Sequence, residues 1–459
     1  MIIELRYINM TRKITIMLMI SLLAISVAAQ DMAVTIYNSN LGVISEIRPL
    51  EFDQGIGRLA FRDVPSKIDP ASVRFEVTDA NHKVAILEQN YAYDLVSPDQ
   101  LYAKYLDNQI ELINEQGTLY TGDLLAYSSG AVTLRELSGR VKIIQMDNIT
   151  ETNFPLLPDG LITRPTLFWE YQSDQAGTFD CQVSYQTGGM TWEAEYVGLL
   201  DQNETKLDLS GWASINNTSG KTYHDAKLKL IAGDIHRAEK KHDQGLAEFG
   251  RMTMAAATPG FQEKAFFEYH MYTLPRSATL ADKEMKQISL FEPASTGVEK
   301  IYYYRPHRSA TDVQVVIECV NSKETGLGMP LPAGRVRIFK ADDDGSMILL
   351  GEDRLDHTPQ DEEISLTIGN AFDIKGEETI LKQTRISKKV EDREFEIELR
   401  NHKSEDVIVR VEKRLWGFFE VTQSSHEYNR KDARTLAFEI PVKAKSETKV
   451  RFTVRFTTR

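Results

Sequence analysis

The sequence predicts a mainly β protein with several domains. Its dominant pattern is an alternation of apolar and polar residues with a period of two, as in residues 394–399 and 449–456. That pattern is typical of a strand with one buried and one solvent-exposed face. Turn residues such as Ser219-Gly220 and Asp344-Gly345 separate many such runs, and few helical patterns interrupt them. Short strands joined by polar turns favour antiparallel β-sandwiches of the immunoglobulin type and small barrels.

The 459 residues are enough for about three domains. After a signal peptide over residues 1–29 we expect an N-terminal β domain over 30–96 and a small β-barrel over 97–164. A β-sandwich over 165–310 and a C-terminal β-sandwich region over 311–459 follow. Residues 237–262 mix lysine, glycine, methionine and alanine without alternation, which indicates a mobile insertion within the first sandwich.

The N-terminus has the features of a secretory signal peptide. Arg12 and Lys13 precede an apolar run over residues 14–27, and Ala28 and Ala29 supply small residues before Gln30. The run is shorter than the about 20 residues that a membrane-spanning helix needs, and no later segment is apolar enough to span. We therefore expect the mature chain outside the cytoplasm, in the periplasm, at the cell surface or secreted.

A helix and short bent strands predict the small barrel. Ser97 is a suitable N-cap, and Pro98 and Asp99 suit a first helical turn. Strand-like runs follow over residues 109–114, 118–127, 131–137 and 140–146, and Gly122 lies where a barrel strand would bend. This order resembles the Sm-like family, with residues 144–149 standing where that family carries its second signature.

The resemblance to Sm-like proteins implies RNA binding, and the residues argue against it. That family has Arg and Gly where this chain has Gln145 and Met146, so the guanidinium that would stack on bases is missing. Residues 97–151 hold four basic and eight acidic side chains, a net charge of −4, which repels a phosphate backbone. We therefore interpret the barrel as a spacer or a protein-binding module.

Bulk charge and cysteine content limit the partners. A net charge of −13 disfavours nucleic acid and anionic lipid. The two cysteines, Cys181 and Cys319, both lie in alternating runs; a disulfide and two buried free thiols are both compatible with this spacing.

The motifs that could indicate a cofactor or a metal lack the neighbouring sequence features that such sites need. Residues 55–60 match a loose dinucleotide loop, but residues 58–63 read as a strand that runs into Val64-Pro65 and no helix follows, so we interpret the segment as a hairpin. Asp342, Asp343 and Asp344 before Gly345 suit a hairpin tip better than a calcium loop. The 9 histidines show no zinc spacing, and no serine lies in a nucleophile elbow. The sequence therefore predicts no cofactor and no metal.

Several segments together resemble a known family. They include VTIYNSNL at 34–41, FRDVP at 61–65 with IDP at 68–70, TWEAEY at 191–196, residues 211–234, PLPAGRV at 330–336, GED at 351–353 and HTP at 357–359. The chain resembles bacterial proteins grouped as domain of unknown function 4139, which are related to the mucoidy-inhibitor proteins. The resemblance implies an exported, β-rich protein and supplies no catalytic residue.

The best candidate for a binding surface is Trp416-Gly417-Phe418-Phe419. Trp416, Phe418 and Phe419 follow the charged residues 412–414 and could form an exposed platform for a peptide or glycan. The alternative, which the general burial of aromatic side chains favours, is that they cap the core of the last sandwich.

Two functions follow from these observations. The first is an exported, envelope-associated binding or structural protein whose partner is an envelope protein or glycan. The alternative is an extracytoplasmic hydrolase of envelope polymers that uses carboxylates from separate strands. The lack of a local nucleophile, metal or phosphate motif favours the first.

Overall fold

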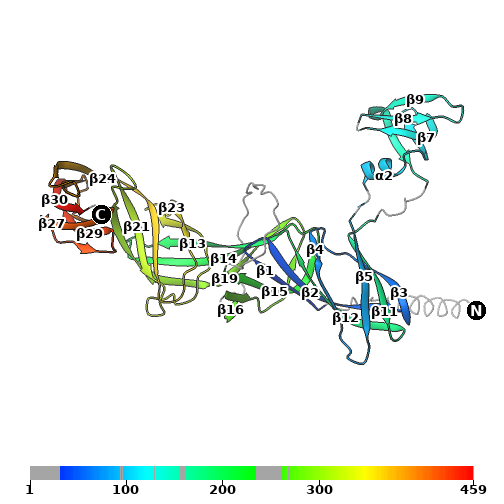
Figure 1. The fold of residues 1–459 in the computed structure, drawn as a ribbon, viewed down its shortest axis with the longest axis horizontal. Coiled ribbons are helices and arrows are strands. Elements are labelled where there is room, and N and C mark those ends of the chain that lie inside the picture. The colour runs from blue at the N-terminus through cyan, green and yellow to red at the C-terminus, as the bar shows by residue number, and fades with distance from the viewer. Residues whose placement is uncertain are drawn as a thin grey trace, which may run out of the picture.

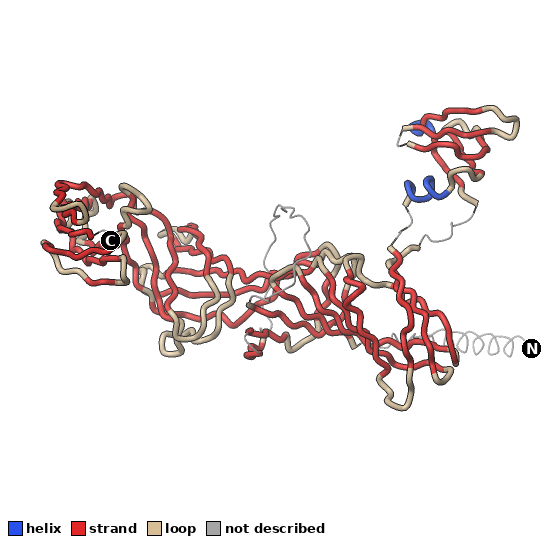
Figure 2. Tube along the Cα trace, viewed as in Figure 1, coloured by secondary structure: helices blue, strands red, loops and turns tan. Residues whose placement is uncertain are grey.

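The computed structural model describes residues 31–93, 95, 97–128, 130–155, 162–233, 261–266 and 269–457. Within these residues nearly all regular structure is β-strand, and the one α-helix belongs to a small domain beside an elongated body (Figure 1, Figure 2). The predicted mainly β fold is therefore confirmed. The signal peptide expected over residues 1–29, and residues 237–260 of the expected insertion, lie outside the described part of the chain.

Two sheets form the N-terminal unit of the body. The larger has the order β16-β17-β15-β1-β2-β12-β4, with β18 paired to β15, and the smaller has the order β3-β11-β5. The bounds of the larger sheet are β1 Met32–Tyr37, β2 Leu41–Phe52, β4 Ile68–Val77, β12 Gly177–Thr187, β15 Tyr223–Ala232, β16 Gln262–Phe266, β17 Tyr269–Thr273 and β18 Ala278–Leu280. Those of the smaller are β3 Gly55–Arg62, β5 Val84–Ala92 and β11 Thr166–Ser173.

Strands from before residue 93 pair in these sheets with strands from after residue 165. β2 pairs with β12, β1 runs parallel to β15, and β11 lies between β3 and β5. The sheets therefore cross the boundaries expected at residues 97 and 165. Alternation of apolar and polar residues marks where a strand is and not which strand it pairs with, so the sequence pattern could not show this.

A middle sheet continues the body. Its order is β19-β14-β13-β22-β23, with the bounds β13 Met190–Leu200, β14 Lys206–Asn217, β19 Glu284–Gly297, β22 Gly334–Ala341 and β23 Met347–Leu355. Trp192 and Tyr196 of β13 are fully buried in a core shared with the N-terminal unit. Their polar atoms are satisfied, because Trp192 donates to the Ile231 carbonyl at 3.0 Å and Tyr196 to the Pro332 carbonyl at 2.7 Å.

The C-terminal sheet has the order β27-β30-β25-β24-β21-β20-β26-β29-β28. Its bounds are β20 Glu299–Tyr304, β21 Asp312–Val320, β24 Glu363–Arg385, β25 Val390–Asn401, β26 Val407–Arg414, β27 Phe418–Ser424, β28 Asn429–Arg430, β29 Thr435–Val442 and β30 Ser446–Thr457. β25 and β30, which contain the two alternating runs singled out in the sequence, are antiparallel neighbours. Their apolar faces share one core in which Phe395 stacks on Phe452 at 5.3 Å, as the alternation predicted.

The small domain holds α2 Pro98–Lys104 and a five-stranded sheet. Ser97 caps α2 by accepting a hydrogen bond from the Gln100 amide at 3.2 Å, as expected. The sheet order is β10-β6-β7-β8-β9, with the bounds β6 Gln109–Asn114, β7 Leu119–Tyr127, β8 Ala131–Arg135, β9 Val141–Gln145 and β10 Ile149–Asn153; the short 3-10 helix η1 Met146–Asn148 precedes β10. Within the described residues β9 and β10 do not pair, so the sheet is open and not a closed barrel.

Glycine is required at Gly122 by close backbone approach. A Cβ there would lie 2.6 Å from the Arg135 carbonyl oxygen of β8.

Two predictions of hairpins differ in outcome. Gly345, with φ 83°, turns β22 into β23 as a hairpin. The hairpin expected at residues 55–60 is wrong, because Gly55–Arg62 form one continuous strand, β3.

Both cysteines are buried free thiols. Burial, with a small contribution from a nearby carboxylate, raises the pKa of Cys181 to about 12 and that of Cys319 to about 11. Both thiols are therefore protonated and unreactive near neutral pH.

Candidate functional site: an arginine cleft beside Trp416

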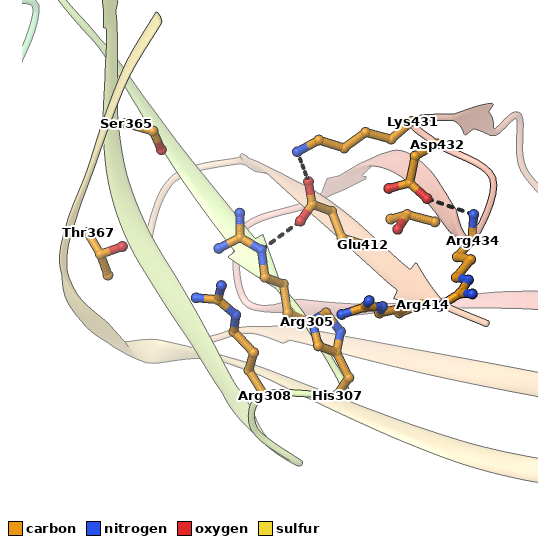
Figure 3. Close-up of a pocket in the computed structure, with 11 residues that line it drawn as sticks. Arg305, His307, Arg308, Ser365, Thr367, Glu412, Arg414, Lys431, Asp432 and Arg434 are labelled. Atoms are coloured by element: carbon orange, nitrogen blue, oxygen red, sulfur yellow. Dashed lines mark hydrogen bonds and ion pairs between the residues drawn. The ribbon is translucent and has the colours of Figure 1, made fainter. Parts of the chain in front are cut away.

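A cleft of about 590 Å³ opens on the C-terminal sheet. Its walls come from the end of β20 and the following turn, from β24, from the end of β26 and from the segment that joins β28 to β29. The lining residues, drawn in Figure 3, are Arg305, His307, Arg308, Ser365, Thr367, Glu412, Arg414, Lys431, Asp432, Arg434 and Thr435. We call this site the arginine cleft.

Two short turns bring the basic residues together. After β20, the Arg308 amide donates to the Arg305 carbonyl at 2.8 Å, which closes a tight turn around Pro306. After β28, the Lys431 amide donates to the Thr435 carbonyl at 3.0 Å, and Asp432 accepts from the Arg434 amide at 2.6 Å. These turns present side chains from sequence positions more than a hundred residues apart to one space (Figure 3).

Glu412 holds two of the cations. Its side chain is 8% exposed and accepts from Arg305 Nε at 2.6 Å and from Lys431 Nζ at 2.6 Å. Burial acts to raise the pKa of Glu412, but the hydrogen bonds from Arg305 and Lys431 outweigh it and hold the pKa below its ordinary value of 4.5. Glu412 is therefore ionised at neutral pH, and its charge is compensated by these two side chains.

The other three arginines make no close ion pair in the described part of the chain, although the Asp432 carboxylate attracts Arg414. Within the described residues Arg308, Arg414 and Arg434 form no ion pair, although most arginines of the same sheet do, including Arg393, Arg400, Arg410, Arg451 and Arg455. The pKa of His307 is lowered first by burial and then by repulsion from Arg308 and Arg414. The cleft is thus a region of positive potential on a chain whose net charge is −13.

The aromatic residues predicted as a binding surface lie beside this cleft. Trp416 and Phe418 are exposed, at 63% and 57%, whereas Phe419 is half-buried against the core. Gly417 adopts φ 81° between β26 and β27, a backbone conformation that glycine accepts readily. The structure therefore places Trp416 and Phe418 outside the core and Phe419 at its edge.

Trp416 holds arginines at the cleft. The guanidinium carbon of Arg414 lies 4.7 Å from the centre of its ring, and that of Arg434 lies 5.5 Å from it. Such cation–π contacts orient a guanidinium and leave its N–H groups available. The sequence pattern indicated the aromatic residues but not Arg305, Arg308 and Arg434. The basic clusters at 305–308 and 430–434, which stand out in an acidic chain, are the signal that could have indicated them.

The carboxyl groups of the cleft do not resemble those of a hydrolase. Hydrogen bonds from the Arg434 amide and Thr435 lower the pKa of Asp432, and the pKa of Glu412 is lowered as described above. A general acid for glycoside cleavage needs a raised pKa. Nothing in the cleft therefore favours hydrolysis.

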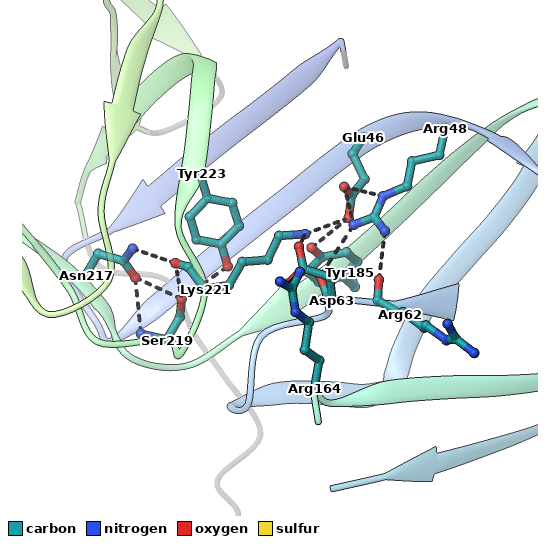
Figure 4. Close-up of polar contacts among 10 residues, drawn as sticks. All are labelled: Glu46, Arg48, Arg62, Asp63, Arg164, Tyr185, Asn217, Ser219, Lys221 and Tyr223. Atoms are coloured by element: carbon teal, nitrogen blue, oxygen red, sulfur yellow. Dashed lines mark hydrogen bonds and ion pairs between the residues drawn. The ribbon is translucent and has the colours of Figure 1, made fainter. Parts of the chain in front are cut away.

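A second polar cluster lies inside the N-terminal unit (Figure 4). Glu46 of β2 is completely buried and accepts from Tyr185 Oη at 2.9 Å and from Arg48 Nε at 2.8 Å. Lys221, in the turn between β14 and β15, points its Nζ toward Glu46 at 3.4 Å. Asp63 and Arg164 extend the cluster to the surface, where Arg164 Nη1 lies 3.4 Å from Asp63 Oδ1.

This cluster has the character of a structural contact. Burial lowers the pKa of Lys221, while the Glu46 carboxylate acts in the opposite direction. Each buried charge faces an opposite charge, which is the condition under which buried ionic groups are tolerated. The cluster ties the β14–β15 turn to β2 and β12.

Two further kinds of feature are absent from the described residues. No group of three or more metal-ligating side chains has a geometry that could hold an ion. Among the same residues, no helix is both long enough and apolar enough to cross a membrane.

The fold and the cleft define a β protein of several sheets with a basic surface site. The sequence profile of the Domain of unknown function (DUF4139) matches residues 181–458, which is more than half of the chain. The chain belongs to this family. Segments 34–41 and 61–70, which also carried the resemblance, precede the matched range. No curated protein shows significant similarity to the chain.

Proposed function

We propose that the protein is an exported, envelope-associated binding protein and that Trp416 and Phe418, together with the arginine cleft, form its ligand-binding surface. One observation carries the proposal: Trp416, which is 63% exposed, contacts two arginines of the cleft, and Phe418, two positions further along the chain, is 57% exposed. Burying such a side chain stabilises a protein by about 1.5–3 kcal/mol, so an exposed pair next to a cleft indicates a surface that meets a partner.

Export is supported by the N-terminal sequence. The basic pair at 12–13, the apolar run and the small residues before Gln30 suit a secretory signal. We further propose that the protein is bacterial and related to the mucoidy-inhibitor proteins, as the shared segments suggest. An envelope protein or glycan is then the natural class of partner.

A cell-fractionation experiment tests the binding role. Full-length wild-type chain and the double variant Trp416→Ala/Phe418→Ala are produced with the leader, and washed envelopes are separated from soluble fractions. We expect the wild type in the envelope fraction and the double variant in the soluble extracytoplasmic fraction. Phe372→Ala is the matched control, because Phe372 is an exposed aromatic of β24, at 90%, that does not line the cleft.

The result against the proposal is equally clear. Retention of the double variant at the wild-type level would show that Trp416 and Phe418 do not make the envelope contact. Loss of retention in Phe372→Ala as well would show a general effect of removing surface aromatics and not a site.

A further inference from the structure

The arginine cleft concentrates positive charge that the protein itself does not neutralise. Five basic side chains and two carboxylates line it, which leaves a surplus of three positive charges. Arg305 and Lys431 share the single charge of Glu412, which leaves one positive charge with that pair. Asp432 offsets one charge near Arg414, so the other two positive charges of the surplus lie among Arg308, Arg414 and Arg434. Like charges held in one cleft repel each other, and a bound anion would relieve that repulsion.

Several of these cations are fixed in place before any ligand arrives. Arg305 is held by Glu412, donates to Gln314 Oε1 at 3.0 Å, and lies 4.0 Å from the centre of the Tyr303 ring. Trp416 restrains Arg414 and Arg434 through its cation–π contacts. Side chains that are already ordered lose less entropy on binding, which favours affinity for the matching ligand.

The residue types define what the ligand must be. A guanidinium presents its N–H groups as a planar fork that pairs with two oxygens of a carboxylate or a phosphate. Arg308 and Arg434 come from two different turns and Arg414 from the end of β26. Ser365 and Thr367 of β24 add hydroxyl groups on a further wall (Figure 3). A ligand with one oxyanion group would reach only part of this arrangement.

We propose that the arginine cleft binds a small anion that carries two or more oxyanion groups, either linked phosphates or several carboxylates. This inference rests on the binding role proposed above and names the ligand class of that site. Trp416 is then a positioning residue for Arg414 and Arg434, as well as part of the exposed rim.

Calorimetric titration of the purified mature protein tests the inference. The probes are tripolyphosphate and citrate at low ionic strength, with acetate as the single-group comparison. We expect saturable binding of one equivalent of tripolyphosphate, citrate or both, acetate binding too weak to measure, and loss of affinity as salt is added. The relative affinities of the two probes distinguish phosphate from carboxylate recognition.

Arg308→Gln/Arg434→Gln is the decisive variant. Each substitution removes charge-assisted hydrogen bonds, so the affinity should fall at least about tenfold. The matched control is Arg354→Gln, because Arg354 is an exposed arginine of β23 that forms no ion pair within the described residues. Thermal unfolding without ligand checks the fold: the double variant should unfold close to the wild type, since the loss of repelling charges offsets the loss of the Arg434–Trp416 cation–π contact.

Two outcomes overturn the inference. The first is that neither polyanion binds the wild type, and the second is that the double variant binds as tightly as the wild type does. Either result leaves the envelope-retention experiment on Trp416 and Phe418 unaffected, so failure of the ligand class and failure of the binding role can be told apart.

Discussion

Lys221 and Glu46 lie 175 positions apart in the sequence, and the lysine Nζ is 3.4 Å from the carboxylate inside the protein. Lys221 falls within the part of the chain that matches the family, residues 181–458, and Glu46 precedes it. The family region is therefore joined to the first strands by a buried ion pair as well as by strand pairing. This relationship makes the earlier strands part of the structural unit to which the family region belongs.

Breaking this pair should destabilise the protein strongly. Lys221→Met leaves the Glu46 carboxylate buried with one cation fewer, and loss of one partner of a buried pair costs about 3–5 kcal/mol. The measurement is the free energy of unfolding by denaturant. Lys227→Met is the control, because Lys227 pairs with Asp31 at the surface, where the side chains are 69% and 54% exposed; its effect should not exceed about 1 kcal/mol. Equal effects of the two substitutions would contradict the structural role of Lys221.

A comparison of two aromatic residues tests the division between core and surface in the C-terminal sheet. Phe452 is 1% exposed and contacts Phe395 and Phe438, with ring centres at 5.3 and 5.2 Å. Phe452→Ala should therefore lower the free energy of unfolding by about 3–5 kcal/mol. Trp416→Ala should lower it by no more than about 1 kcal/mol, since an exposed side chain loses mainly its cation–π contacts. A loss for Trp416 as large as that for Phe452 would place Trp416 in the core.

The strands of this protein could be predicted from the sequence more readily than their partners. The alternating runs predicted both β25 and β30 as strands with one buried face, and the two strands pair through the facing charges Glu396–Arg451 and Glu398–Lys449. Where partners are distant in sequence, as for β2 and β12, alternation carries no such information. The parallel pairing of β1 with β15 was missed for the same reason.

The candidate site was predictable only in part. Trp416 and Phe418 were identified because three aromatics around a glycine are conspicuous in the sequence, although general burial statistics argued that they would be covered. The cleft beside Trp416 was missed because its residues come from segments far apart in the sequence: the turn after Arg305, the end of β26 at Glu412 and the turn after Lys431. Only the pairing of β20 with β26, and of β26 with β29, brings those turns together.

The expected signal peptide over residues 1–29 leads to a prediction that is independent of the fold. Produced in a bacterium with its leader, the protein should be recovered outside the cytoplasm with Gln30, or a residue within one or two positions of it, at the N-terminus. N-terminal sequencing or intact-mass measurement of the folded product gives the answer. A product that begins at Met1 or Met10 would remove the basis for an envelope role.

Glu412 provides a test of the electrostatics of the arginine cleft. Its pKa is lower in the folded protein than the ordinary value of 4.5, so folding favours the ionised form. The stabilisation from Glu412 is then fully present above the unfolded-state pKa and is lost as pH falls through the folded-state pKa. Wild-type stability should therefore decline, in part through this residue, as the pH falls below the ordinary pKa of 4.5.

The variant Glu412→Gln separates this contribution from that of the other carboxylates. At neutral pH it leaves Arg305 and Lys431 without their counter-charge, and it should lower the free energy of unfolding by about 1–3 kcal/mol. On acidification the gap between wild type and variant should narrow, because the wild type loses the charge that the variant already lacks. Glu427→Gln is the control, since Glu427 is exposed and makes no ion pair within the described residues; it should show neither effect. A gap that stays constant or widens as pH falls would mean that Glu412 is not ionised in the cleft, and the neutralisation of Arg305 and Lys431 by Glu412 would have to be abandoned.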